Sequence, residues 1–358
     1  MRRKPGSTVQ CWPIDQWPAG DQTLWQAGFA EAELFGVSGL GVNWSPMSRR
    51  KAAQGYGYWL HWLQRQGWLQ AEILPAARVN RDRVAQYVRD LTPIYAPYSR
   101  AARVQELYDA LRLLAPDTDW AWLLQVYQAL RSRAHPTRQK RQRLRPVADM
   151  IELGQNLMRQ AEQTTAWSAQ RRAVAYRDGL MITLLVHRPL RLKTFSLMRL
   201  DHHLVSRQGT VWLLFTAAET KTRTAYEAVV PVALLPALQR YLTQYRPILL
   251  RGEGGRAPTA TDAVWVSEVS TQLEAGALSR RIQHRTAAAF GTSIPPHWFR
   301  DIATTAIATD RPAHVGDAGL VLGHADHRTT ERHYNQAQGL HAARRWQDTL
   351  AELRGGAS

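Results

Sequence analysis

Three short patterns lie close together near the end of the chain: HWFR at 297–300, VLGH at 321–324 and TTERHY at 329–334. His297 and Arg300 are three positions apart, so they share a face if this segment is helical. A glycine before His324 allows the left-handed conformation that ends helices. Two histidines, an arginine and a tyrosine on a basic surface suit a phosphodiester. The cations would stabilise charge on phosphorus oxygens, and a tyrosine hydroxyl is a possible covalent nucleophile.

The whole chain is basic. It has 358 residues with 46 Lys+Arg against 29 Asp+Glu, which gives a net charge of +17. Only five of the 46 are lysines, and codon bias explains that preference for arginine but not the excess of both over acids. The charge therefore makes a polyanion the first partner to consider. The length predicts two domains rather than one.

The cysteine count and the apolar runs predict the compartment. Cys11 is the one cysteine, so neither a disulfide framework nor a cysteine-based zinc site is expected. No motif supplies a third histidine ligand, so we expect no metal. The first residues are charged without an apolar stretch behind them, and no apolar run approaches the ~20 residues of a membrane helix. We therefore expect a soluble protein in the cytoplasm, associated with the nucleoid, with no membrane partner.

Helical periodicity dominates the chain. Residues 1–45 lack a sustained pattern and predict an arm or lead-in. Residues 46–165 contain apolar residues at i, i+3, i+4 and i+7 in several stretches, which predicts an all-helical domain. We expect its first helix to begin at a Ser48 cap and to end at Gly67.

Residues 166–358 add strands to helices. Apolar residues over 205–215 predict a hairpin that turns at 207–209, and a third strand is expected at 226–230. Helices are expected near 168–187, 191–199, 232–246, 277–290, 297–309, 315–322, 327–335 and 340–353. The predicted fold class is therefore mainly α with a small antiparallel β-sheet (α+β).

A basic stretch lies between the two regions, with no acid between Asp119 and Asp149. One interpretation is a solvated helix face or linker; the alternative, which the charge of the chain favours, is contact with a nucleic-acid backbone. Its members are Arg131, Arg133, Arg138, Lys140, Arg141, Arg143 and Arg145.

The three patterns resemble the C-terminal signature of tyrosine recombinases (the phage integrase family), in which H-x-L-R-H precedes L-G-H and a tyrosine that follows T-T. Two upstream stretches fit as well. PLR at 189–191 with LMR at 197–199 resembles the stretch around the family's first catalytic arginine, and ETKT at 219–222 resembles the turn that carries its lysine. A general acid must be able to lose its proton, which lysine can do and arginine cannot. A lysine at this turn of an arginine-rich chain therefore favours Lys221 as the family's catalytic lysine.

The match is incomplete at three places. Asp301 replaces a second histidine, Thr194 stands where many members have glutamate, and His324 and Tyr334 are ten residues apart where nine is commoner. Arg188 competes with Arg191 for the role of first arginine, but Leu190 and the spacing to 198–199 favour Arg191.

The resemblance implies a site-specific DNA recombinase that forms a covalent 3′-phosphotyrosine. Tyr334 would attack the scissile phosphate, and Lys221 would protonate the departing 5′ oxygen. The remaining candidates would hold the phosphate or move a proton: Arg191, His297, Arg300 and His324.

The resemblance also implies the organisation of the protein. Residues 46–165 would be a core-binding domain (SAM-like) and 166–358 the catalytic domain with a C-terminal helix. Double-stranded DNA would be the partner, a homo-tetramer would act on paired sites, and no cofactor would be needed. In that family, integration, excision, resolution of dimers and gene-cassette movement all use the same active site, so the resemblance does not choose among them. A type IB topoisomerase-like nicking-closing enzyme and a non-catalytic DNA-binding regulator are the alternatives.

Overall fold

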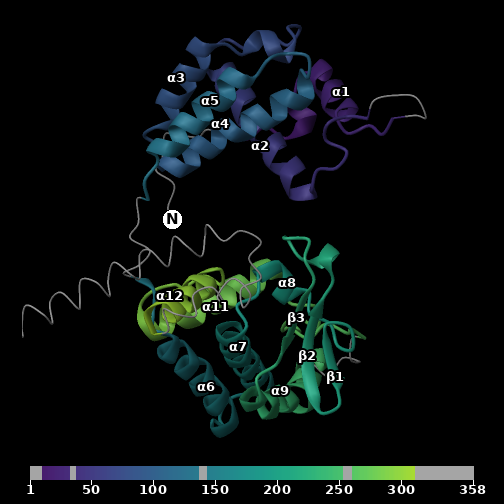
Figure 1. Ribbon diagram of the computed structural model, residues 1–358, viewed down its shortest axis with the longest axis vertical. Coiled ribbons are helices and arrows are strands. Elements are labelled where there is room, and N and C mark those ends of the chain that lie inside the picture. Colours follow the sequence, from purple (N-terminus) through teal and green to yellow (C-terminus); the bar gives the residue numbers. More distant parts are fainter. Residues whose placement is uncertain (1–9, 33–37, 137–142, 253–259, 311–358) are drawn as a thin grey trace, which may run out of the picture. The chain divides into compact units, whose positions relative to one another are not determined.

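The protein forms two compact units, Met1–Gln139 and Lys140–Ser358, which are described separately below (Figure 1). In this computed structural model the described residues are 10–32, 38–136, 143–252 and 260–310, with side chains to residue 307. The helices expected beyond 310, with His324 and Tyr334, lie outside these ranges. None of the helices in the described ranges combines the length and the apolar character that a membrane crossing needs.

The described part of the first unit consists of helices joined by turns and loops, without a strand. Its apolar stripes are buried as predicted: Val84, Tyr87 and Leu91 on α3, and Leu107 and Leu111 on α4, are all at most 1% exposed. The elements are η1 (Ile14–Gln16), α1 (Ala19–Ala27), α2 (Pro46–Arg65), η2 (Pro75–Arg78), α3 (Arg81–Leu91), α4 (Pro97–Leu114) and α5 (Ala121–Arg133).

The cap of α2 differs from the prediction. The capping residue is Ser45, three residues before the expected Ser48, and its side chain accepts the Ser48 N–H at 3.1 Å, so the helix starts at Pro46. Proline at the first position of a helix costs no hydrogen bond, so the Ser45-Pro46 pair is a strong start. The helix ends just before Gly67, as expected.

Residues 14–27 belong to the core of this unit, in contrast to the lead-in expected over 1–45. Trp17 and Trp25 are buried. The Asp21 carboxylate on α1 lies 2.5 Å from the Arg78 guanidinium and accepts the Tyr56 hydroxyl at 2.7 Å. This buried ion pair ties α1 to η2, and the sequence missed it because its partners are 57 residues apart.

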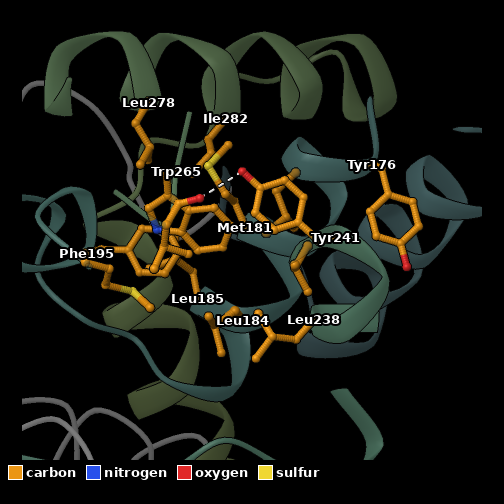
Figure 2. Close-up of a cluster of buried hydrophobic side chains, with 14 of the residues drawn as sticks. Tyr176, Met181, Leu184, Leu185, Phe195, Leu238, Tyr241, Trp265, Leu278 and Ile282 are labelled. Carbon is orange, nitrogen blue, oxygen red and sulfur yellow. Dashed lines mark hydrogen bonds between the residues drawn. The ribbon is translucent and has the colours of Figure 1, made fainter. Parts of the chain in front are cut away.

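The second unit is built around α7 (Ala169–His187), whose residues 173–186 are buried on all sides. The helices around it are α6 (Val147–Gln163), α8 (Leu192–Ser196), α9 (Leu235–Arg240), α10 (Arg246–Arg251), α11 (Ala275–Phe290) and α12 (Trp298–Asp310). A 3-10 turn, η5 (Val232–Leu234), precedes α9, and a π-helical turn, η6 (Tyr241–Tyr245), joins α9 to α10. Figure 2 shows the core, in which Met181, Leu184 and Leu185 of α7 meet Tyr241, Trp265 and Ile282.

Helices α6 and α7 pack backbone against backbone. A Cβ on Gly179 would lie 2.5 Å from the Gly154 carbonyl oxygen, and one on Gly154 would lie 2.1 Å from the Thr183 hydroxyl. Both positions therefore exclude a side chain. Because α6 shares the core of the second unit, the division of the chain falls after residue 139 and not after the expected 165.

The second unit contains one three-stranded antiparallel sheet, in the order β1-β2-β3. The strands are β1 (Leu204–Arg207), β2 (Thr210–Phe215) and β3 (Tyr226–Val229). Gln208 and Gly209 join β1 to β2 with φ of 49° and 76°, the backbone of a tight two-residue hairpin turn. The prediction of a mainly α fold with a small antiparallel sheet is confirmed.

A buried ionic network links α7 to α11. The Asp178 carboxylate is within 2.8 Å of the guanidinium groups of Arg177, Arg281 and Arg285. Arg177 also donates to the Val266 carbonyl at 2.7 Å. Burial alone would raise the pKa of Asp178, but the three cations outweigh it and lower that pKa. The carboxylate is therefore ionised inside the core.

Candidate active site

The break after α7 positions Arg191. Pro189 cannot continue a helix, and the chain turns there before α8 begins. Leu190 is buried beneath the turn, while Arg191 is the half-buried residue that precedes α8. Among the described residues, no carboxylate forms an ion pair with the Arg191 guanidinium.

Arg300, in the first turn of α12, reaches the same place. Its Nη1 donates to the Pro189 carbonyl oxygen at 2.8 Å, which ties α12 to the segment between α7 and α8. Burial and the positive charge of Arg191 lower the pKa of Arg300 to about 10, although Asp301 acts in the opposite direction. The guanidinium stays charged at neutral pH, so two like charges lie near each other at a half-buried place. Such a pair favours an anion.

Arg188 and Tyr226, which are not among the six catalytic candidates, lie near the Arg191–Arg300 pair. Arg188 donates from Nε to the Val229 carbonyl at 3.0 Å and from Nη1 to the His187 carbonyl at 3.0 Å. It therefore braces the end of α7 against β3. Burial raises the pKa of Tyr226 on β3, while the nearby charges of Arg188 and Arg300 partly offset that effect. The sequence offered no signal for Tyr226 here, because strand pairing alone brings it to the arginines.

His297 lies in the turn before α12 and not within the helix, which starts one residue later than expected. Its side chain is exposed, and its ring meets the ring of Trp298 edge-on at 6.2 Å. Backbone bonds from Trp298 and Phe299 to the carbonyls of Pro295 and Pro296 fix this turn. His297 and Arg300 are thus three residues apart across the start of α12.

Lys221 is exposed in the turn between β2 and β3, the location expected for it. A short 3-10 segment, η4 (Ala217–Glu219), opens this turn. The structure thus brings Arg300 to the segment that carries Arg191 and places Lys221 on the β2–β3 turn.

One group of three possible metal ligands occurs among the described residues. The side chains of His202, His203 and Glu219 bring one ligand atom each to within 4.8 Å of one another. His203 Nε2 is 2.9 Å and His202 Nε2 is 3.2 Å from the same Glu219 oxygen. No local sequence pattern points to these residues, because 16 positions separate His203 from Glu219.

The described members of the basic stretch are divided between the units. Arg131 and Arg133 are exposed at the end of α5, and Arg131 lies over the Tyr98 ring at 4.5 Å. In the second unit, Arg143 lies over the Trp298 ring at 5.6 Å, and Arg145 donates to the Phe290 carbonyl at 3.2 Å. The other three members lie outside the described residues: Arg138, Lys140 and Arg141.

No family model and no curated protein matches the chain in sequence. Several solved structures match its fold, including the following two. The XerH site-specific recombinase bound to difH substrate, in a pre-cleavage complex, has a TM-score of 0.56 at 14% identity, over 81% of this chain and 77% of that chain. A post-cleavage complex of XerH with palindromic difH has a TM-score of 0.57 at 13% identity, over 84% and 80%. The chain has the fold of a tyrosine recombinase.

Proposed function

We propose that this protein is a site-specific DNA recombinase that cuts and rejoins double-stranded DNA through a covalent 3′-phosphotyrosine. The observation that carries the proposal is the half-buried Arg191–Arg300 pair, held by the bond from Arg300 to the Pro189 carbonyl. Two adjacent guanidinium groups match the non-bridging oxygens of one phosphate, because each presents paired N–H donors.

In the proposed reaction the phenolic oxygen of Tyr334 attacks the scissile phosphorus and the bond to the 5′ oxygen breaks. His297 accepts the proton of the tyrosine, and Lys221 gives a proton to the departing 5′ oxygen. Arg191, Arg300 and His324 stabilise the charge on the phosphate. The phosphotyrosine keeps the energy of the phosphodiester for rejoining, so no nucleotide or metal enters the reaction.

The two units suit different tasks in this proposal. The helical first unit would grip DNA as a core-binding domain, with Arg131 and Arg133 against the backbone. The second unit would carry the chemistry and, with its C-terminal segment, join other copies in a tetramer on paired sites. The XerH structures are complexes with DNA, which supports DNA as the partner of this chain.

A capture experiment tests the proposal without knowledge of the target. The full chain is incubated with a random DNA library in EDTA, covalent adducts are isolated under denaturing conditions, and their DNA is sequenced. We expect adducts with the wild type at one enriched sequence and none with Tyr334→Phe, which should still bind that sequence. An adduct in the phenylalanine variant would show that another residue is the nucleophile.

Strand exchange distinguishes the alternatives. Two copies of the enriched sequence on one plasmid should recombine. Relaxation of supercoiled plasmid without exchange would instead indicate a nicking-closing enzyme, and specific binding with no adduct at all would indicate a regulator on the same scaffold.

A further inference from the structure

We propose that Glu219, held by His203, is a positioning residue that places the turn carrying Lys221 for proton transfer to the leaving 5′ oxygen. The inference rests on the proposed function and adds to it a residue that acts through the lysine. His203 lies directly before β1 and three residues after Leu200, a half-buried residue that packs against the core.

The His203 ring is fixed on several sides. It is 3% exposed and stacks on Phe215 of β2 at 4.8 Å. Its Nδ1 accepts the Arg199 backbone N–H at 3.0 Å, and its carbonyl accepts the Leu214 N–H at 2.9 Å. The imidazole therefore has no freedom to turn.

These bonds determine the tautomer of His203. Because Nδ1 accepts a hydrogen bond from the Arg199 backbone amide, the hydrogen of the neutral ring must be on Nε2. Nε2 then donates to the Glu219 carboxylate at 2.9 Å. A histidine that binds a metal needs the opposite arrangement, in which the ligating nitrogen has a lone pair and the other nitrogen donates. The His202–His203–Glu219 group is therefore a hydrogen-bonded anchor and not a metal site.

The other carboxylate oxygen of Glu219 closes the start of the turn. It accepts the Thr216 backbone N–H at 2.9 Å and the Thr216 hydroxyl at 2.8 Å. With His202 and His203 on the first oxygen, four donors converge on one carboxylate. These bonds, that to the Thr216 N–H first, lower the pKa of Glu219 to about 2, so the anchor remains charged at any working pH.

The anchor lies two residues before Lys221. Directly between them, Thr220 closes the remainder of the turn, because its hydroxyl donates to the Thr224 carbonyl at 2.8 Å and accepts the Thr224 N–H at 3.1 Å. Residues 221–223, which begin with Lys221, therefore form the end of the turn. The Thr220–Thr224 bonds hold these residues on both sides, and Glu219 joins the start of the turn to His202 and His203 before β1. The lysine side chain itself is exposed, so its backbone is what the anchor fixes.

The test uses the DNA isolated by adduct capture, in two forms. One has the ordinary 5′ bridging oxygen at the cleavage site and the other has sulfur there. A thiolate leaves without a proton, so the sulfur substrate bypasses the general acid. We expect Glu219→Ala to slow adduct formation on the oxygen substrate by ~10²-fold, the effect of a misplaced catalytic group, and to cleave the sulfur substrate at the wild-type rate.

Two further variants, Lys221→Ala and Glu227→Ala, serve as controls for Glu219→Ala on both substrates. Lys221→Ala should show the same rescue by sulfur, with a loss on oxygen of about 10²–10⁴. Glu227→Ala, which removes an exposed carboxylate from β3 of the same hairpin, should leave both rates unchanged. Amide hydrogen exchange over 216–224 should be faster in Glu219→Ala than in Glu227→Ala, and thermal unfolding checks that both variants fold.

Each contrary result has a distinct meaning. A full oxygen rate in Glu219→Ala, or an equal loss on both substrates, would overturn the positioning role. A wild-type rate that falls in EDTA would overturn the anchor in favour of a metal. If Lys221→Ala were not rescued by sulfur, the assignment of the general acid in the proposed function would fail instead.

Discussion

Two arginine clusters of the second unit have opposite electrostatic designs. Around Asp178, three guanidinium groups share one buried carboxylate, and Arg177 has a backbone carbonyl as well. At the break after α7, Arg191 and Arg300 lie together, and the charge of Arg191 contributes to the lowered pKa of Arg300. The first arrangement satisfies its charges within the chain and stabilises the fold. The second holds two like charges near each other, and no carboxylate in the described part of the chain forms an ion pair with Arg191, so Arg191 can change with little loss of stability.

Asp178→Asn should have the largest effect on folding. The substitution leaves the buried Arg177 without its counter-charge, and breaking such a buried pair costs about 3–5 kcal/mol. Chemical denaturation of the full chain should show this loss. An unchanged free energy of unfolding would mean that the network does not stabilise the core.

The same carboxylate predicts a response to acid. Its pKa is lower in the folded chain than its ordinary value of 3.8, so its stabilisation is complete above that value and is lost as the pH falls below it. The wild type should therefore lose stability on acidification more steeply than Asp178→Asn. Parallel pH profiles would contradict this account.

Arg191→Ala should have the next largest effect, on activity alone. Removal of one donor to the developing phosphate charge should lower adduct formation by about 10²–10³, or roughly 3 kcal/mol. The free energy of unfolding should stay within ~0.5 kcal/mol, because the change also relieves repulsion with Arg300. Arg207→Ala, at an exposed position of β1, is the control for the lost charge. A destabilised Arg191→Ala would place this residue with the Asp178 network.

Within the basic stretch, Arg133 is an exposed arginine, whereas Arg145 is bonded to a backbone carbonyl within the chain, so the two should respond differently to replacement. Arg133→Ala should reduce the slope of log binding constant against log salt by about 0.9, the value of one phosphate contact, without a change in stability. Arg145 donates to the Phe290 carbonyl, so Arg145→Ala should instead lower the free energy of unfolding by about 0.5–1.5 kcal/mol. Equal salt slopes for wild type and Arg133→Ala would show that Arg133 faces solvent in the complex.

Asp262→Asn should have the smallest effect. The Asp262 carboxylate is 3.9 Å from Arg199, and both side chains are more than half exposed. Surface pairs of this kind contribute ~0–1 kcal/mol. Denaturation midpoints that match the wild type are expected, and a loss as large as that of Asp178→Asn would remove the distinction between buried and exposed pairs.

Local signals explain what the sequence predicted. Apolar periodicity located α3, α4 and α7, and the glycine at 209 located the hairpin turn. No local pattern in the sequence shows that Arg300 of α12 reaches the Pro189 carbonyl next to Arg191. That these two arginines lie near each other was expected only from the resemblance to tyrosine recombinases. The Asp178 network, the anchor at Glu219 and the burial of α1 were missed, because each joins residues far apart in the chain. All six catalytic assignments stay predictions, and His324 and Tyr334 lie outside the described residues.

The glycine contact between α6 and α7 has a consequence for the variation of this protein. Because Gly154 and Gly179 let the two backbones touch, the helix that follows the connecting segment and the helix that leads to Arg191 form one rigid body. A side chain at Gly154 or Gly179 would force the two helices apart and move the end of α7 together with Arg191. These two positions should therefore vary less than the exposed positions of the same helices.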